Sequence, residues 1–560
     1  MKTDKHRFYT TNFAALRLCG ILLFCFALLV VPAIAQSQPK MSSRVLLIPL
    51  DDRPPCLQFP VKMGLIGDAE IVTPPREILG RFTEAGKSDE IIKWLKMQNL
   101  KSFDAAIVSI DMLAYGGLVA MRVHQTDDAT AVRRIEFVRE MRRLAPKMKI
   151  YGSSVIMRLA PTGDVKNEAY REKLARWAEV SVEADAKSKS ETAKLEREIP
   201  AFALADYKAA RVRDLKINLK TIDLTREGVI DYLILSQDDA KPKGIHVADR
   251  ERLIAETARL NLTEKIAVQP GADEVSMLLL ARSLTDKYNY HPRIKAVYSS
   301  DATKNQFMPY EDRALNQTVS FHIKAVGASE VADEKQADIL FYVFASRFEN
   351  GRAESFAGEI ADKTQANKRV IVADVDPKGD VQGGGVKFTE ALLDKKIFKR
   401  LYSYAAWNTA GNTIGTTLPQ GVIFAVKEKI YTKLKRENHA RWLEKNEVKI
   451  NRMQQAQDWF MLNRLFDDYV YHSIVRPDAL NFIRSNKWNS FRLTDEQTTK
   501  VVEFSLEKMK PKISDIAQRY FQNEKCSISE LDFVLPWNRT FEAEINFKNP
   551  CPFRLPQPTI

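Results

Sequence analysis

Histidine and cysteine are scarce in this chain, with 7 His and 5 Cys among 560 residues. So few histidines argue against a zinc site built from several imidazoles. The three cysteines beyond the N-terminal segment, Cys56, Cys526 and Cys551, have no zinc or iron–sulfur spacing. An oxidising compartment would permit a bridge between Cys526 and Cys551, and the alternative is that both remain thiols. No cysteine has the setting of a nucleophile, and we expect no cofactor and no metal.

Motifs of two large enzyme classes are also absent. The sequence has no Gly-x-Ser-x-Gly nucleophile elbow and no Walker phosphate-binding loop. The glycine run at 383–385 lacks a preceding strand at the right distance, which favours a flexible loop. The sequence therefore predicts neither a serine hydrolase with that elbow nor a P-loop nucleotide-binding protein.

The charges do not form a block of one sign. The formal net charge is +13, but 85 Lys and Arg are interspersed with 72 Asp and Glu. No basic stripe is interleaved with aromatic residues, so we expect no nucleic-acid partner. An apolar fraction of 45% without a low-complexity tract indicates a globular protein. The basic surface suits loose contact with anionic polymers of the cell envelope.

The one long apolar run lies near the N-terminus, at 18–31, after a basic start. Small residues, Ala33 and Ala35, follow it at the positions that a signal peptidase requires. We therefore expect a signal peptide over 1–35 and a periplasmic or secreted protein without stable membrane insertion. The alternative is a retained anchor, because a run of this length is short for a membrane span but not excluded as one.

Short apolar runs alternate with helical patterns along most of the chain, which predicts an α/β fold with parallel sheet. Two weaker runs, 71–73 and 319–323, could add strands, and helical periodicity is clear at 129–144, 249–260 and 273–288. The nine clearest strand runs are 45–50, 105–110, 150–156, 231–236, 265–268, 294–299, 339–344, 370–373 and 401–406.

The favoured architecture is a (β/α)8-like barrel over 43–415, the TIM-barrel plan, with a charged helical insertion at 167–219. From 416 to 560 helical patterns dominate, and a short β tail closes the chain at 533–547. Nine strands are one more than such a barrel needs. A doubly wound parallel sheet with a second α/β domain is the alternative.

Polar side chains follow nearly every predicted strand. In parallel α/β folds the ligand binds at the carboxyl ends of the strands, because the loops converge there. Asp301 and Asp273 could instead cap helices, and Asp51 to Arg53 could form a self-contained ion-pair corner. The expected pocket residues are Asp51, Asp52, Arg53, Asp111, Arg158, Asp238, Asp239, Gln269, Asp273, Glu274, Trp407, Asn408 and Asn412.

Such a set favours glycoside hydrolysis, which uses one neutral and one charged carboxyl group. Asp238 and Asp239, adjacent at the end of the fourth predicted strand, are the first choice for catalysis. Glu274 is the rival catalytic carboxylate, and its alternative role is to start the next helix. Trp407 could stack on a sugar with Asn408 and Asn412 binding hydroxyls, or it could belong to the core.

The adjacent aspartates resemble those of O-GlcNAcase-type barrel hexosaminidases. In that family one Asp orients the substrate 2-acetamido group and the next is the general acid/base. The resemblance implies these roles for Asp238 and Asp239, and a substrate that contains N-acetylhexosamine. It covers one dipeptide and its place in the fold.

A second resemblance covers most of the chain. It is to a bacterial domain-of-unknown-function family of the DUF4127 type, which implies membership but no activity. The segments that carry it are Pro49-Leu-Asp-Asp-Arg-Pro54, Asp111-Met-Leu-Ala-Tyr-Gly-Gly117, Gln237-Asp-Asp-Ala240 with Gly244, His246, Asp249 and Arg250, Gln269-Pro-Gly-Ala-Asp-Glu274, and Trp407-Asn-Thr-x-x-Asn412.

Two other functions fit the same residues. The first is a metal-dependent hydrolase of esters or phosphates, which would hold a hard cation. The second is a glycan-binding protein without catalytic activity, which would keep its affinity for the glycan in Asp239→Asn. Loss of activity with chelator would distinguish the metal-dependent enzyme from the glycosidase. The expected ligands of the cation in that metal-dependent enzyme are Asp51, Asp52, Asp238, Asp239 and His246.

Overall fold

The computed structural model describes residues 40–164, 166–437 and 439–548, with side chains left out at 433–445. The expected signal peptide, 1–35, and Cys551 lie outside this part, so the peptide and the Cys526–Cys551 bridge stay predictions. The chain divides after Lys40, and the unit that begins at Met41 is described here. Over the described ranges, no helix is both long and apolar enough to cross a membrane.

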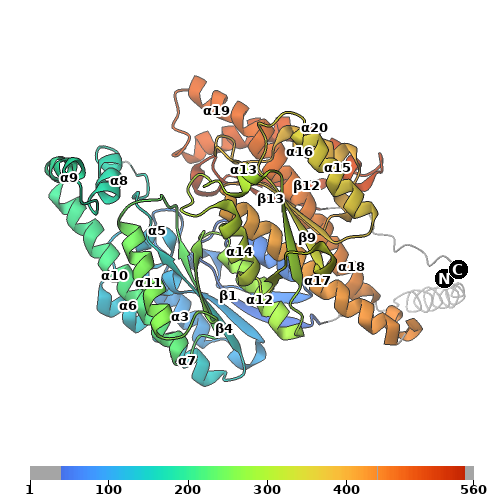
Figure 1. Ribbon diagram of the computed structural model, residues 1–560, viewed down its shortest axis with the longest axis horizontal. Helices are drawn as coiled ribbons and strands as arrows, with labels where there is room; N and C mark the ends of the chain where they lie inside the picture. The colour runs from blue at the N-terminus through green and yellow to red at the C-terminus, as the bar shows by residue number, and fades with distance from the viewer. Residues whose placement is uncertain (1–39, 165, 438, 549–560) are drawn as a thin grey trace, which may run out of the picture. The chain divides into compact units, whose positions relative to one another are not determined.

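Eleven parallel strands form two open sheets (Figure 1). The first sheet has the order β2-β1-β3-β4-β5-β6 and the second the order β11-β10-β9-β7-β8. The strands of the first are β1 (Ser43–Ile48), β2 (Ala69–Val72), β3 (Ala105–Ser109), β4 (Lys149–Ile156), β5 (Tyr232–Gln237) and β6 (Ile266–Pro270). Those of the second are β7 (Arg293–Tyr298), β8 (Ser329–Glu330), β9 (Ile339–Phe344), β10 (Val370–Asp374) and β11 (Ser403–Ala405).

The α/β class with parallel sheet is confirmed, but the (β/α)8-like barrel is not. The strands divide between two sheets because β7 pairs with β9 and β8 rather than with β6. The arrangement is thus nearer to the alternative with a second α/β part. All nine clear strand runs form strands, and the weak run at 71–73 belongs to β2. The other weak run, 319–323, is helical within α14 (Leu315–Ala325).

Three helices join the sheets into one apolar core: α2 (Gln58–Ile66), α12 (Val275–Tyr288) and α17 (Ala410–Glu437). α12 packs on β3 and β4 of the first sheet, and α17 packs on β10 and β11 of the second. The two helices also pack against each other. The boundary expected at 415 therefore falls inside α17, which shares the core of the second sheet.

A second apolar core lies on the opposite face of the first sheet. Its helices are α3 (Ser88–Lys96), α4 (Ile110–Tyr115), α5 (Leu118–Met121), α6 (Asp128–Ile135), α7 (Phe137–Leu144), α10 (Ala201–Arg226) and α11 (Ile245–Arg259). The insertion expected at 167–219 is helical: α8 (Arg171–Val180), α9 (Ala186–Glu198) and α10. The outer helices of the second sheet are α13 (Asp301–Lys304), α15 (Arg352–Gln365) and α16 (Val386–Asp394).

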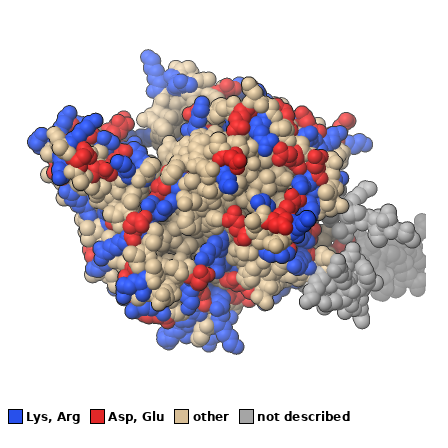
Figure 2. Space-filling model, in the orientation of Figure 1, with Lys and Arg blue, Asp and Glu red and all other residues tan. Residues whose placement is uncertain are grey.

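The C-terminal region is mostly helical and ends in a small antiparallel sheet. Its elements are α18 (His439–Arg464), the π-helix η5 (Leu465–Val475), α19 (Arg476–Ser485), α20 (Asp495–Phe521), β12 (Ser529–Val534) and β13 (Glu544–Lys548). A capping box at Thr494 and Gln497 fixes the start of α20. On the face shown in Figure 2, basic and acidic side chains are interspersed, in agreement with the sequence pattern.

Candidate functional site

A cavity of about 490 Å³ lies where the loops at the carboxyl ends of both sheets meet. Its walls come from the segments after β1, β2, β3, β4, β5, β6, β7, β10 and β11, and from the segments 489–492 and 537–541 of the C-terminal region. Seven of the expected site residues line it: Arg53, Arg158, Asp238, Asp239, Asp273, Asn408 and Asn412.

Asp238 and Asp239 follow β5, and each is paired with an arginine. Arg122 donates to Asp238 at 2.6 Å and to the hydroxyl of Thr162 at 2.7 Å. Arg158 donates to Asp239, whose side chain is 41% exposed against 8% for Asp238. Burial raises the pKa of Asp238, but Arg122 and Arg158 outweigh it, so this pKa lies below its usual value. Asp238 is thus suited to act as a charged acceptor.

Glu311 is another carboxyl that lines the cavity, and the sequence did not point to it. The backbone N–H of Ala240 donates to the carbonyl of Tyr310 at 2.9 Å, which holds the Asp239 loop beside Glu311. Oε1 of Glu311 accepts from the N–H of Gly411 at 2.9 Å, whereas the buried Oε2 of Glu311 has no partner among the described residues. Burial, with smaller effects of Glu274 and Asp239, raises the pKa of Glu311 to about 8.

Glu274, predicted as a catalytic rival, does not line the cavity. Its fully buried side chain contacts Nε2 of His322 at 3.2 Å, at the start of α12. It occupies the N-cap position of that helix but makes no capping hydrogen bond with its side chain. Two glycines leave space for this carboxyl: a Cβ at Gly271 would lie 1.6 Å from its Oε1, and one at Gly415 would lie 2.0 Å from its Cγ.

The space at Gly415 gives a test of this packing. Gly415→Ala is expected to destabilise the fold by about 1–3 kcal/mol, because the new methyl group overlaps Glu274. The matched control is Gly358→Ala in α15, where the nearest atom lies 4.0 Å away. The free energy of unfolding of that control should rise by about 0.5–1 kcal/mol, because alanine has a higher helix propensity than glycine. Urea unfolding measures both changes, and equal stability of the two variants would contradict the packing described.

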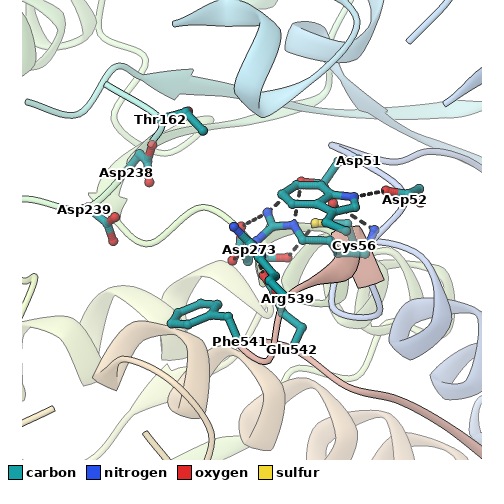
Figure 3. A network of polar contacts seen from close by, with 12 residues as sticks. Asp51, Asp52, Cys56, Thr162, Asp238, Asp239, Asp273, Arg539, Phe541 and Glu542 are labelled. Carbon is teal, nitrogen blue, oxygen red and sulfur yellow. Dashed lines mark hydrogen bonds and ion pairs between the residues drawn. The ribbon is translucent and has the colours of Figure 1, made fainter. Parts of the chain in front are cut away.

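A buried ion cluster forms the wall opposite Asp238 and Asp239 (Figure 3). Arg53 donates to Asp51 at 2.6 Å, to Asp273 at 2.7 Å and to Glu542 at 3.0 Å. Arg539 also pairs with Glu542. Three carboxyls thus face two guanidinium groups. Burial and the charge of Asp51 outweigh the attraction of Arg53 and raise the pKa of Asp273 to about 7.

Trp537 covers this cluster on the cavity side. Its ring lies 4.7 Å from the guanidinium carbon of Arg53 and 4.6 Å from that of Arg539. Its Nε1–H donates to Asp52 at 2.7 Å. Burial raises the pKa of Asp52, and the hydrogen bond from Trp537 opposes that shift. Asp51 and Arg53 are thus paired, but the corner is not self-contained, because Arg53 also binds Asp273 and Glu542 and Asp52 pairs with Arg76. Of Asp51, Asp52 and Arg53, only Arg53 lines the cavity.

Three further predicted residues lie outside the cavity. Asp111 is buried under β4, where it accepts from the N–H of Val155 at 3.0 Å, and burial raises its pKa well above the usual value. Gln269 is buried in β6. Trp407 belongs to the core: its Nε1–H donates to Thr416 at 2.9 Å, so it offers no face to a ligand.

The ligand set expected for a hard cation is not brought together. Over the described ranges, the candidate group for a metal is Asp51, Cys56 and Asp273, with ligand atoms within 4.8 Å of one another. The guanidinium of Arg53 hydrogen-bonds both carboxylates of that group. His246 is buried in another place, where its Nε2 contacts the carbonyl of Lys241 at 2.9 Å. These donors therefore do not fit the metal site proposed from sequence.

The missed residues gave little signal in the sequence. Glu311 follows β7 by more than ten residues, and Arg122 lies beyond two short helices. Trp537 comes from the C-terminal region, more than a hundred residues after the last parallel strand. The strand-end rule looks only at residues next to strands. The double glycine at Gly116 and Gly117, both at positive φ, was the one available sign of a turn leading to Arg122.

Among curated proteins, none matches the chain. One family does, under the description "protein of unknown function (DUF4127)", over residues 45–546. The match includes both sheets, the helical insertion and most of the C-terminal region. The chain therefore belongs to the DUF4127 family, in agreement with the resemblance stated from its sequence.

Proposed function

We propose that the protein is an exported glycoside hydrolase, periplasmic or secreted, and that the cavity is its active site. Glu311 serves as the general acid that protonates the leaving oxygen. Asp239 is the charged carboxylate that acts as base or nucleophile, and Asp238, fixed by Arg122, orients the substrate. These roles give Glu311 the protonating function that the hexosaminidase resemblance assigned to Asp239.

The carboxyl pair of Asp239 and Glu311 carries the proposal. Glycoside hydrolysis needs one carboxyl that stays protonated near neutral pH and one that is charged. Glu311 has a pKa of about 8 in a buried site, and Asp239 is paired with Arg158. The hydrogen bond from Ala240 to Tyr310 keeps the two segments adjacent. The pair thus combines the two required protonation states in one cavity.

The remaining walls suit a sugar. Asn408 and Asn412 line the cavity, and the buried Oδ1 of Asn412 has no partner among the described residues. An amide oxygen in that position can accept from a sugar hydroxyl. Tyr310 and Phe491 line the same cavity, with 53% and 66% of their surface exposed. Exposed rings of this kind cover the apolar face of a pyranose.

The test is hydrolysis of a panel of aryl glycosides, including the N-acetylglucosaminide and N-acetylgalactosaminide, with and without chelator. The purified protein should hydrolyse at least one of them, with turnover that chelator does not change. Asp239→Asn should reduce that turnover by about 10²–10⁴-fold, while the control Glu354→Gln on the exposed side of α15 keeps it.

Three results would overturn the proposal. Sugar binding that persists in Asp239→Asn without turnover of any glycoside would indicate a glycan-binding protein. Turnover lost with chelator would indicate a metal-dependent enzyme. Full activity of Asp239→Asn would remove this residue from the chemistry.

A further inference from the structure

The cavity contains six arginines, and five have a carboxylate partner. Arg53 and Arg539 pair within the ion cluster, Arg122 with Asp238, Arg158 with Asp239, and Arg492 with Asp164. The sixth, Arg171, has no ion pair with any carboxylate that the structure describes. Its Nε–H donates to the carbonyl of Pro161 at 3.0 Å. Its terminal nitrogens are therefore available to a ligand.

The position of Arg171 is unfavourable for a cation. It is the first residue of α8, where the helix dipole presents its positive end. Arg158 stands nearby, and burial together with this second cation lowers the pKa of Arg171. Residues that break a local rule of stability without a structural partner are concentrated at functional sites. The charges of Glu172 and Asp239 favour the charged form of Arg171, but burial and Arg158 outweigh them.

A second unsatisfied donor lies in the same wall. Nε of Arg122 is buried without a partner among the described residues, although the other nitrogens bind Thr162 and Asp238. Thr162 and Gly163 also line the cavity, and the nearest atom to a Cβ placed at Gly163 would be Nε of Arg171, at 3.6 Å. Arg122, Arg158 and Arg171 thus bring three guanidinium groups to a part of the cavity that holds two aspartates, Asp238 and Asp239.

We propose that Arg171 binds an anionic group of the substrate, so that the glycan cleaved is an acidic one. This inference rests on the proposed function and names its substrate class. The group is an oxyanion on a sugar, either a carboxylate or a phosphate, because a guanidinium binds both through paired N–H donors. The negative charge of this group would give Arg171 an ion-pair partner, as Asp239 does for Arg158 and Asp238 does for Arg122.

The test measures binding of glucuronate, its neutral isostere glucuronamide, glucose 6-phosphate and inorganic phosphate by isothermal titration. We expect glucuronate or the phosphosugar to bind at least about tenfold more tightly than glucuronamide, as one charge-assisted contact provides. In Arg171→Gln this preference should disappear while the affinity for glucuronamide is unchanged. The matched control is Arg176→Gln in the same helix, whose ion pair with Glu191 lies on the exposed surface.

The two acidic sugars distinguish a carboxylate from a phosphate as the bound group, and inorganic phosphate distinguishes anion capture from recognition of a sugar. Equal affinity for glucuronate, glucose 6-phosphate and glucuronamide, or a preference that survives Arg171→Gln, would overturn the inference. Binding of none of the probes would overturn it as well.

Failure of the proposed function has a different signature. In that case the charge preference is present and lost in Arg171→Gln, yet no acidic or neutral glycoside is hydrolysed. Conversely, hydrolysis of neutral glycosides with no preference for charge would leave the glycosidase in place and remove the acidic substrate.

Discussion

Glu311→Gln is expected to reduce turnover by about 10²–10⁴-fold, because the leaving oxygen loses its proton donor. Glutamine keeps the size of the side chain and can still accept from the N–H of Gly411, so the cavity wall should stay in place. The measurement is kcat and KM on the substrate found with the glycoside panel. A loss in kcat with unchanged KM would place the effect in the chemical step.

The pH profile separates a general acid from a structural residue. A general acid must be protonated, so activity should fall as pH rises through the pKa of Glu311, about 8. Residual activity of Glu311→Gln should lack that limb. A substrate whose leaving group departs without protonation should recover most of the lost rate in Glu311→Gln. Azide should not recover it, because azide is a nucleophile and not a proton donor. An unchanged basic limb in the variant would contradict the assigned role.

The thermal stability of Glu311→Gln shows whether its loss of activity comes from unfolding. The pKa of Glu311 is raised from 4.5 to about 8, so the unfolded chain releases this proton first as pH rises. The folded protein therefore loses stability across that interval, by about 1.4 kcal/mol per pH unit for one such group. Glu311→Gln has no such loss and should melt at a higher temperature than the wild type near pH 8. Low activity with raised stability is typical of an active-site residue.

The fold was predictable element by element, but its assembly was not. Runs of β-branched and aromatic residues gave the strands, because a buried parallel strand needs them on both faces. Which strand pairs with which depends on distant contacts, and β7 begins a new sheet after α12. The signal for this was present: nearly every residue of α12 from Val275 to Leu284 is buried. A helix that is apolar on all sides is enclosed between layers.

The candidate site was predictable as far as the strand ends reach. The rule found Asp238, Asp239 and Asp273, because parallel strands end at one edge. It could not say which side chains turn inward, so Asp111 and Trp407 were expected in the cavity and lie in the core. Glu311 was beyond its reach, since the raised pKa of that residue comes from burial and from chain segments far apart in the sequence.

The second large effect is expected for Arg53→Met, through stability. The change leaves Asp51, Asp273 and Glu542 buried with one guanidinium fewer, and breaking such a cluster costs about 3–5 kcal/mol. Glu542 lies between β12 and β13, so the C-terminal tail should also become more sensitive to protease. The measurements are thermal unfolding and limited proteolysis.

The pH dependence of that loss identifies its cause. Burial raises the pKa of Asp273 to about 7, so lowering the pH neutralises this one of the carboxyls that Arg53→Met leaves unpaired. The deficit of the variant should therefore shrink between pH 8 and pH 5. The control is Arg76→Met, which removes pairs with Asp52 and Glu544 from a side chain that is 45% exposed and should cost about 1 kcal/mol or less. If Arg53→Met were no more harmful than this control, or its deficit did not change with pH, the cluster would not anchor the tail to the cavity wall.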